Sequence, residues 1–289
     1  MKVAIIGGSG KMGSWFARFF LKEDKDVLLV GRSSQKLENI KQQLDVSVTT
    51  SMEDTKQADI ILISVPVDNF EETVKKLSPY THPDQTILDI TSVKTLPVEA
   101  MHKYIVRGRI LGTHPVFGPG ARSLANQNFV LTPTNEQEKE LAEEINSYLE
   151  IKGARVHLMT PLEHDDMMAI ILGLAHFIAI ASADSLANLE RMKEMESVGG
   201  ITYKVLLTLV ESVISEDPEL YASLQMNLPN LTHFQKRFLQ SCENWAELVK
   251  QKDRQQFISH MKAIRQKLET KNPNFGKSYD NMYKIAENL

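Results

Sequence analysis

Short apolar runs alternate with amphipathic stretches through residues 1–160. We expect the runs to be strands at Val3–Ile6, Val27–Val30, Val46–Val48, Ile60–Val65, Thr86–Ile90, Arg109–Leu111 and Asn128–Leu131. The amphipathic stretches Met12–Leu21 and Ser34–Leu44 predict helices. The almost unbroken apolar run at Ile60–Val65 is typical of a central parallel strand that is covered on both faces. This alternation predicts an α/β fold with a doubly wound sheet, whose ligands bind beyond the carboxyl ends of the strands.

The pattern changes after residue 160, where helical periodicity replaces the strands. Turn signals follow at Gly199–Gly200, Asp217–Pro218, Leu228–Pro229 and Asn272–Pro273. We therefore expect a doubly wound α/β domain over residues 1–160 and an all-helical domain over residues 161–289. The most apolar segment, Met167–Ala183, is short for a membrane span and is interrupted by a glycine and a histidine. We expect a helix over Met167–Leu189 that packs against other helices or against a second subunit.

Composition narrows the classes of partner. The formal net charge of −4 provides no basic excess to neutralise phosphates, so we expect no nucleic-acid partner. The single cysteine, Cys242, excludes an internal disulfide and suits a reducing compartment. Met1–Gly7 already has the pattern of a strand entering a turn rather than that of a secretory signal. We expect a soluble cytoplasmic protein with no membrane partner.

A dinucleotide fingerprint follows the first predicted strand and precedes the first predicted helix. The residues that match G-x-G-x-x-G are Gly8, Ser9, Gly10, Lys11, Met12 and Gly13. Glycines here permit a tight turn, let backbone N–H groups approach a pyrophosphate, and let the helix lie close to the strand. A purely structural glycine turn is the alternative. The context at both ends favours dinucleotide binding.

The end of the second predicted strand indicates which dinucleotide is bound. NAD-binding versions carry an acid there for the ribose hydroxyls. This chain has Gly31, Arg32 and Ser33 instead. An arginine with hydroxyl neighbours can pair with the 2′-phosphate of NADP, although a solvated arginine before a serine helix cap is the plainer interpretation. We expect NADP, with NAD as the alternative.

Polar groups also follow three other predicted strands. Ser64, Val65 and Pro66 end one strand and are expected to lie along the nicotinamide side of the cofactor. Ser92 and Lys94 follow the next strand, and His114 follows the run Arg109–Leu111. Taken singly, these residues are explained by a helix cap, a solvated lysine and a core histidine. Together at one edge of a sheet they predict a catalytic site with His114 as its base.

The helical half offers fewer candidates. Glu163, His164 and Asp165 have the pattern of a helix start, with acids in the first turn. We expect no metal site, because adjacent residues diverge around a helix and neither HExxH nor a cysteine cluster is present. His176 lies in an apolar helix, where a satisfied core histidine is the usual interpretation and a role at a cleft is the alternative.

With these residues identified, the chain resembles the prephenate/arogenate dehydrogenases of tyrosine biosynthesis. The resemblance extends over nearly the whole length, and His-Pro-x-Phe-Gly-Pro together with Ser-Val-Lys is its most specific part. The matching segments are the glycine loop, 64–66, 89–94, 112–119, 123–125, 153–155, 163–165 with His176, and 217–221. The resemblance implies a Rossmann domain, a helical dimerisation domain that forms a homodimer, and an active site in the cleft between the domains.

The resemblance also implies roles for individual residues. His114 is expected to be the catalytic histidine and Ser92 its hydrogen-bonding companion, with Lys94 near the substrate and His176 lining the cleft. Many members have an arginine that holds the ring carboxylate where this chain has Lys204. Lysine keeps the charge and loses the bidentate fork. The anchor is therefore Lys204, or else Arg122 or Lys94 takes its place.

The implied reaction is oxidative decarboxylation of prephenate or arogenate, with hydride transfer to the nicotinamide and proton transfer to a neutral His114. Two other classes compete with it. One is another NADP-dependent Rossmann reductase, of the β-hydroxyacid dehydrogenase or deazaflavin-dependent type, which has no need of the His114 motif. The other is a non-catalytic NADP-binding sensor, which has no need of His114 or Ser92. The choice between prephenate and arogenate, inhibition by tyrosine and association with a chorismate mutase stay open.

Overall fold

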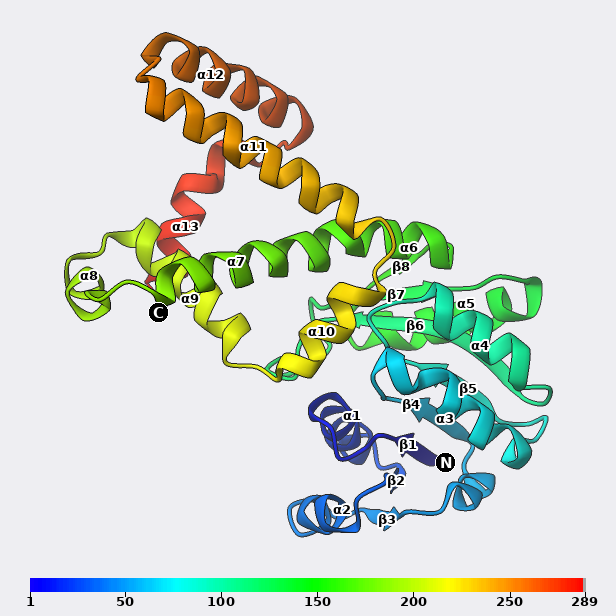
Figure 1. The fold of residues 1–289 in the computed structure, drawn as a ribbon. Coiled ribbons are helices and arrows are strands. Elements are labelled where there is room, and N and C mark those ends of the chain that lie inside the picture. Colours follow the sequence, from blue (N-terminus) through cyan, green and yellow to red (C-terminus); the bar gives the residue numbers. More distant parts are fainter. Residues whose placement is uncertain (288–289) are drawn as a thin grey trace. The chain divides into compact units, whose positions relative to one another are not determined.

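Eight strands form one sheet in the computed structural model, which describes residues 1–287 (Figure 1). The strands are β1 (Lys2–Ile6), β2 (Asp26–Val30), β3 (Ser47–Thr49), β4 (Ile60–Ile63), β5 (Thr86–Asp89), β6 (Arg109–Val116), β7 (Asn128–Thr132) and β8 (Arg155–Leu158). Their order in the sheet is β3-β2-β1-β4-β5-β6-β7-β8. All neighbours are parallel except β6 and β7, which are antiparallel. The strand order reverses between β1 and β4, so the expected doubly wound sheet is confirmed.

Helices cover both faces of this sheet. They are α1 (Lys11–Lys22), α2 (Ser34–Lys41), α3 (Phe70–Leu77), α4 (Thr95–Tyr104) and α5 (Glu136–Ile151). Val3 and Ile5 of β1 pack in one apolar cluster with α1, α2 and α5. Ala4 and Ile6 of the same strand pack in a second cluster with α3 and α4. Because successive side chains of a strand point to opposite faces, the apolar runs of the sequence supply both clusters.

Apart from the short 3-10 helices η1 (Met52–Gln57), η2 (Val67–Asn69), η3 (Ser78–Tyr80) and η5 (Phe275–Lys277), the remaining elements of the described chain follow β8 and are helical. They are α6 (Pro161–Met168), a π-helical segment η4 (Ala169–Leu174), α7 (Ala175–Ala187), α8 (Met192–Val198), α9 (Ile201–Ile214), α10 (Pro218–Asn227), α11 (Leu231–Gln251), α12 (Arg254–Lys271) and α13 (Ser278–Ala286). Helices α11 and α12 lie side by side as a hairpin (Figure 1). Trp245 of α11 closes this hairpin against Phe257 of α12, with 4.8 Å between the ring centroids.

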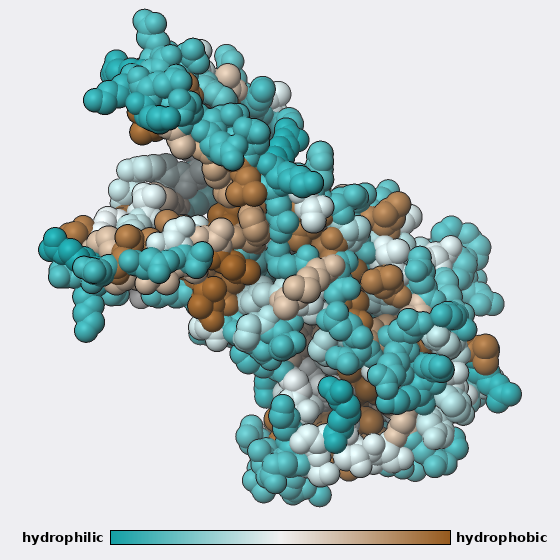
Figure 2. All heavy atoms as spheres, viewed as in Figure 1, coloured by the Kyte–Doolittle hydropathy of each residue, from teal (hydrophilic) through white to brown (hydrophobic). Residues whose placement is uncertain are grey.

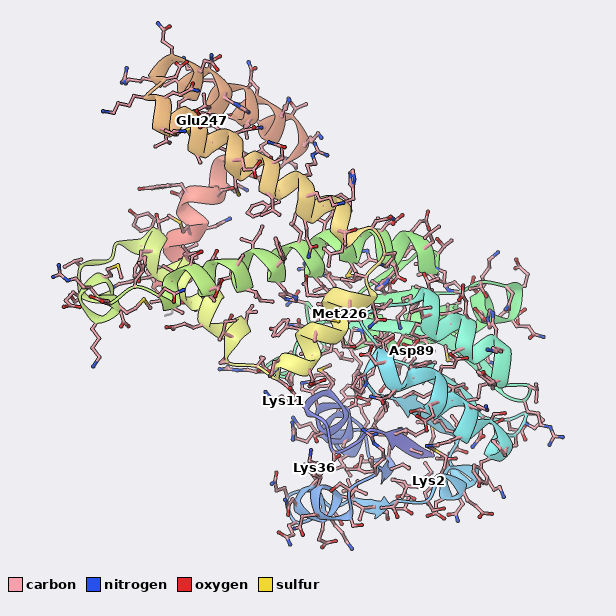
Figure 3. The ribbon with its side chains drawn as sticks, in the orientation of Figure 1. Lys2, Lys11, Lys36, Asp89, Met226 and Glu247 are labelled. Atoms are coloured by element: carbon pink, nitrogen blue, oxygen red, sulfur yellow. The ribbon has the colours of Figure 1, made fainter. Side chains whose placement is uncertain are left out.

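Contacts divide the chain into two compact units. The first unit contains Met1–Met168 and the short segment Met226–Pro229, and the second contains Ala169–Gln225 and Asn230–Leu289. Within the first unit, Asn227 Nδ2 donates to Asp68 Oδ1 over 2.9 Å, close to the Met226 labelled in Figure 3. Helix α6 belongs to the first unit by this division, whereas the boundary expected after residue 160 marks the change from strands to helices.

Strand β6 differs in length from the expectation. The predicted run ended at Leu111, but the strand continues through His114 and Pro115 to Val116. Pairing with β7 sustains it, since Thr113, His114 and Pro115 lie opposite Leu131, Val130 and Phe129. His114 therefore projects from regular strand rather than from the turn that follows, and its backbone lies opposite Val130 of β7.

The expected single helix over Met167–Leu189 is also modified. Its first turns end at Met168, a π-helical segment occupies Ala169–Leu174, and the α-helical pattern resumes at Ala175. A π segment adds a residue to the turn, so spacing arguments based on 3.6 residues per turn do not hold across it.

The helical run Pro161–Ala187 is long and apolar enough to meet the criteria for a membrane-spanning helix. One such run is weak support for a membrane segment, because core helices of soluble proteins meet the same criteria. In this chain many of its apolar residues are exposed, including Ile170 and Ile171, as are Leu206 and Leu209 of α9. Figure 2 shows such apolar residues in brown on the helices of the second unit. The expected packing against other helices is present, since the π-helical segment contacts α11 and α7 contacts α9, but it leaves these apolar side chains exposed in the single chain.

Candidate active site

The glycine loop joins β1 to α1 in a cradle that only glycine permits. Gly7 has a φ of +83°, and a Cβ on Gly13 would lie 2.6 Å from the Gly7 carbonyl oxygen. Gly10 is the N-cap residue of α1, and no side chain caps the helix there. Lys11, labelled in Figure 3, is the first residue of the helix. Because no side chain caps α1, the backbone N–H groups of its first turn can donate to a pyrophosphate. The helix also starts close to the strand, so these residues fit the dinucleotide that the motif implies.

The segment after β2 contains no carboxylate at residues 31–34. Arg32 is exposed, and the Ser33 hydroxyl oxygen accepts from the backbone N–H of Lys36 over 3.3 Å as the N-cap of α2. Ser33 thus acts as a helix cap, and its hydroxyl can still donate a hydrogen bond to a ligand. Arg32 makes no hydrogen bond or ion pair to a carboxylate among residues 1–287, although its charge helps, after that of Lys76, to lower the pKa of Glu72 in α3. A guanidinium without such a bond can pair with an anionic ligand.

A buried ion pair lies where β5 ends, at the Asp89 labelled in Figure 3. Lys94 and Asp89 are both fully buried and bonded to one another. The Lys94 ammonium also donates to the Thr113 carbonyl oxygen over 2.6 Å. Asp89 accepts from the backbone N–H and the hydroxyl of Thr91, and from the backbone N–H of Thr113. These contacts join the end of β5, the start of α4 and the middle of β6.

His114, the residue after Thr113, begins a line of buried side chains. It is 3% exposed, and its Nδ1 lies 2.8 Å from Nε2 of His164 in α6. His164 Nδ1 in turn lies 2.8 Å from Oδ1 of Asp165. The Asp165 carboxylate also accepts the backbone N–H groups of Lys94 over 2.7 Å and of Thr95 over 2.8 Å. Helix α6 is thus tied to the start of α4 and to β6 within the first unit.

The electrostatics of this line favour neutral imidazoles. Burial, together with the neighbouring His164 and the Lys94 ammonium, holds the pKa of His114 well below its ordinary value of 6.5. Burial also lowers the pKa of His164, although the hydrogen bond to Asp165 opposes this. Burial works to raise the pKa of Asp165, but the hydrogen bonds it accepts from His164, Thr95 and Lys94 outweigh burial and lower it. A neutral His114 that is connected through His164 to an ionised Asp165 can accept a proton near neutral pH.

The sheet register places His114 at the same edge as the glycine loop. Ile6, Ile63, Asp89 and Gly112 are aligned across β1, β4, β5 and β6. The residues that follow each of them therefore lie along the carboxyl edge of the parallel strands. Three strand spacings of about 4.8 Å separate β1 from β6, or roughly 14 Å. A dinucleotide on the loop can extend along this edge toward His114.

Other predicted residues lie in the first unit with fewer contacts. Ser92 is partly buried between β5 and α4, and its hydroxyl makes no hydrogen bond to residues 1–287, so the partner of His114 in this structure is His164. Ser64 and Val65 follow β4 along the carboxyl edge, and Pro66 is exposed. Arg122 is exposed and lines a hollow of about 320 Å³ whose lining does not include His114.

The candidates His176 and Lys204 belong to the second unit. The His176 ring packs edge-on against Tyr221, with 5.0 Å between the ring centroids. Its buried Nδ1 has no partner among the described residues, and burial lowers its pKa. Lys204 is exposed in the first turns of α9.

Sequence reasoning missed His164 and Asp165 as site residues. The segment does form the expected helix start, because Thr160 and Glu163 make a reciprocal capping box. That local role explained the pattern and left no reason to connect it to His114, 50 residues earlier. The available signal was the conjunction of a histidine and a carboxylate inside the first turns of a helix that follows the last strand.

Comparison with known proteins agrees with this arrangement. Residues 16–158 match the family model described as prephenate dehydrogenase, nucleotide-binding domain, and residues 160–263 match the one described as prephenate dehydrogenase, dimerization domain. The first match begins after the glycine loop. A probable arogenate/prephenate dehydrogenase of Methanocaldococcus jannaschii is 32% identical over 266 residues, and a T-protein of Enterobacter agglomerans is 30% identical over 268. Each alignment covers 91% of this chain, which spans 60% and 66% of the two relatives.

Solved structures share the fold. Prephenate dehydrogenase from A. aeolicus, solved with hydroxyphenyl propionate and NAD+, superposes with a TM-score of 0.76 at 22% identity, covering 94% of this chain and 98% of that one. Synechocystis arogenate dehydrogenase superposes with a TM-score of 0.71 at 20% identity, covering 95% and 100%. The two family models together cover most of the chain, and the relatives align with nearly all of it. The chain therefore belongs to the prephenate dehydrogenase family.

Proposed function

We propose that this protein catalyses the NADP-dependent oxidative decarboxylation of prephenate or arogenate in tyrosine biosynthesis, with 4-hydroxyphenylpyruvate as the product from prephenate. The observation that carries this proposal is the buried His114, whose pKa is lowered chiefly by burial, at the same sheet edge as the glycine loop. Family membership supports the reaction class. The two curated relatives are longer than this chain, so the activity is proposed on the residues that the chain itself contains.

The substrate carries a hydroxyl on C4 of a cyclohexadiene ring and a carboxylate on C1. The nicotinamide, when bound, supplies the acceptor for the hydride on C4. His114 accepts the hydroxyl proton as that C–H bond breaks, which prevents positive charge from building on the oxygen. The C1–carboxylate bond then breaks, and its electron pair enters the ring. His114 returns the proton to the phenol oxygen, CO₂ leaves, and aromatisation makes the sequence effectively irreversible.

The cations have different parts in this proposal. Lys94 is fully buried, paired with Asp89 and bonded to the Thr113 carbonyl oxygen. It therefore acts on the site through its charge and by holding the backbone of β6 next to His114. Lys204 and Arg122 are exposed and remain the proposed anchors for the ring carboxylate, with His176 as a further contact from the helical unit. The anchors must hold a leaving carboxylate without over-stabilising it in the ground state.

A cytoplasmic homodimer is part of the proposal. The second family model is described as a dimerization domain, and it covers the helical segment whose apolar side chains are exposed in the single chain. A second copy is the partner that would cover Ile170 and Ile171 without a membrane.

The assay that tests the function combines prephenate or arogenate with NADP or NAD and follows the absorbance of the reduced cofactor together with CO₂ release. We expect reduced cofactor and CO₂ in equal amounts with at least one of the two substrates. A protein that binds NADP and reduces it with neither substrate would instead be a sensor. Reduction with a β-hydroxyacid and no CO₂ would identify a different Rossmann dehydrogenase.

His114→Asn should lower kcat by about 10²–10⁴-fold and leave KM within a few-fold, because asparagine keeps a polar group of similar size but cannot act as the base. Steady-state kinetics with the preferred substrate provide the measurement. His157→Asn, at an exposed position in β8, is the matched control and should behave like the wild type. A His114→Asn enzyme that keeps most of its kcat would show that this histidine is structural.

Arg32→Ala should raise KM for NADP by roughly 10–100-fold and change KM for NAD only a few-fold, because a charge-assisted bond to the 2′-phosphate contributes about 1.5–3 kcal/mol. Adding Gly31→Glu should move the preference further toward NAD. The single variant is the cleaner test, since a Cβ at residue 31 would lie 3.2 Å from the Leu37 side chain. Arg107→Ala, at an exposed arginine before β6, is the control. A wild-type enzyme that prefers NAD would contradict the assignment.

Lys204→Ala should raise KM for the substrate by roughly 10–100-fold if this lysine holds the ring carboxylate, since such bonds contribute about 1.5–3 kcal/mol. Lys204→Arg should be tolerated or bind more tightly, because it restores a bidentate fork. Lys193→Ala, another exposed lysine of the helical unit, is the control. Wild-type behaviour of Lys204→Ala, with loss of affinity in Arg122→Ala, would place the anchor on the Rossmann unit.

A further inference from the structure

The carboxylate at the end of the His114 line can only accept hydrogen bonds. Asp165 is fully buried, and both of its oxygens accept backbone N–H groups, from Lys94 and from Thr95. Thr95 begins α4, so the carboxylate also lies at the positive end of a helix. These contacts favour the ionised form. An ionised carboxylate has no proton to give, and the group that faces its Oδ1 must be a donor.

This requirement determines the tautomer of both histidines. His164 Nδ1 lies 2.8 Å from Asp165 Oδ1 and must carry a proton. In a neutral imidazole the other nitrogen, Nε2, is then an acceptor. That nitrogen lies 2.8 Å from His114 Nδ1, so His114 carries its own proton on Nδ1. Nε2 of His114 is then unprotonated and can accept a hydrogen bond. This nitrogen makes no hydrogen bond to residues 1–287.

The charges of the buried side chains around His114 suit a histidine that is protonated only during the reaction. Asp89 and Lys94 cancel one another, and both histidines are neutral at rest. Asp165 then contributes one negative charge to the buried group, offset in part by the start of α4. When His114 accepts a proton, the five side chains sum to zero. Asp165 therefore compensates the imidazolium through His164 without touching the substrate.

We propose that His164 and Asp165 are positioning residues that hold His114 as the Nδ1–H tautomer, with Nε2 free to accept the substrate proton, and that compensate the charge it gains. This kinetic role rests on the proposed function, whereas the tautomer is a property of the resting protein. Neither the sequence motifs nor the family matches assign a role to these two residues.

The tautomer can be measured without turnover. Nitrogen NMR of the protein labelled with ¹⁵N-histidine, at neutral pH, distinguishes protonated from bare ring nitrogens. The His114 signals are identified by their loss in His114→Asn. We expect a protonated Nδ1 and a bare Nε2. A protonated Nε2 on His114 would overturn the proposal whatever the enzyme's substrate is.

Paired substitutions at His164 test the kinetic role. His164→Phe keeps a ring of similar size and removes the acceptor, so kcat should fall by roughly 10²-fold with KM within a few-fold. His164→Gln restores an amide oxygen that can accept from His114 Nδ1–H, so it should recover a large part of kcat. His102→Phe, which removes a histidine paired with Glu138 at 2.6 Å outside this line, is the matched control.

The outcomes separate the two proposals. Wild-type kcat in both His164 variants, with unchanged thermal stability, would overturn the positioning role. Equal loss of kcat in His164→Phe and His164→Gln would show that accepting the His114 proton is not what His164 contributes, and would also overturn it. Should His164→Phe fail to fold, His164→Gln and the NMR measurement still decide the question. Absence of turnover in the wild type, with the expected tautomer present, would overturn the proposed function alone.

Discussion

The fully buried ion pair between Lys94 and Asp89 is the interaction on which the candidate site depends. Asp89 accepts the backbone N–H of Thr113, and Lys94 donates to the carbonyl oxygen of the same residue. Both backbone groups of the residue before His114 are therefore held by one pair of charges. Removing one partner of such a pair leaves an uncompensated buried charge, which typically costs about 3–5 kcal/mol. The pair also joins β5 to the start of α4, where Asp165 is bonded.

Burying His114 has two opposing effects, one on its protonation state at rest and one on its strength as a base. Burial and the nearby Lys94 keep His114 unprotonated, but the same effects make it a weaker base. An ionised Asp165, two hydrogen bonds away, stabilises the protonated state that forms during the reaction. The arrangement favours a resting imidazole that is neutral and an imidazolium that is tolerated for the lifetime of the reaction. Because Asp165 acts through His164, its contribution leaves the face of His114 toward the substrate free.

Much of the first unit could be predicted from the sequence, because periodicity and the glycine loop are local signals. The apolar runs identified the strands, and the glycine spacing identified the cradle in which a Cβ on Gly13 has no room. Strand β6 was predicted too short, since the prolines and glycines after His114 have the pattern of a turn. Pairing with β7, a contact between separate segments, extends the strand through Pro115. The π-helical segment at Ala169–Leu174 was missed for a related reason, as nothing in a 3.6-residue pattern signals it.

The role of His164 could not be predicted from the local sequence pattern. The capping box between Thr160 and Glu163 accounts for the segment as a helix start. Its second role arises only when α6 packs beside β6 and places the ring on His114. Ser92 was named as the companion of His114 from the family resemblance, and in this structure His164 lies against the Nδ1 atom of His114. The roles of Ser92, Arg122 and Lys204 toward a substrate stay predictions.

The pH dependence of kcat/KM for the intact enzyme tests the central claim most directly, because it reports the protonation of the free enzyme. His114 must be neutral to accept a proton, and its environment lowers its pKa, so the neutral form persists to lower pH than for an ordinary histidine. The account predicts an acid limb whose midpoint lies below about 6.5, the unperturbed histidine value. Activity that falls with a midpoint at or above that value would contradict a buried, neutral His114 as the base.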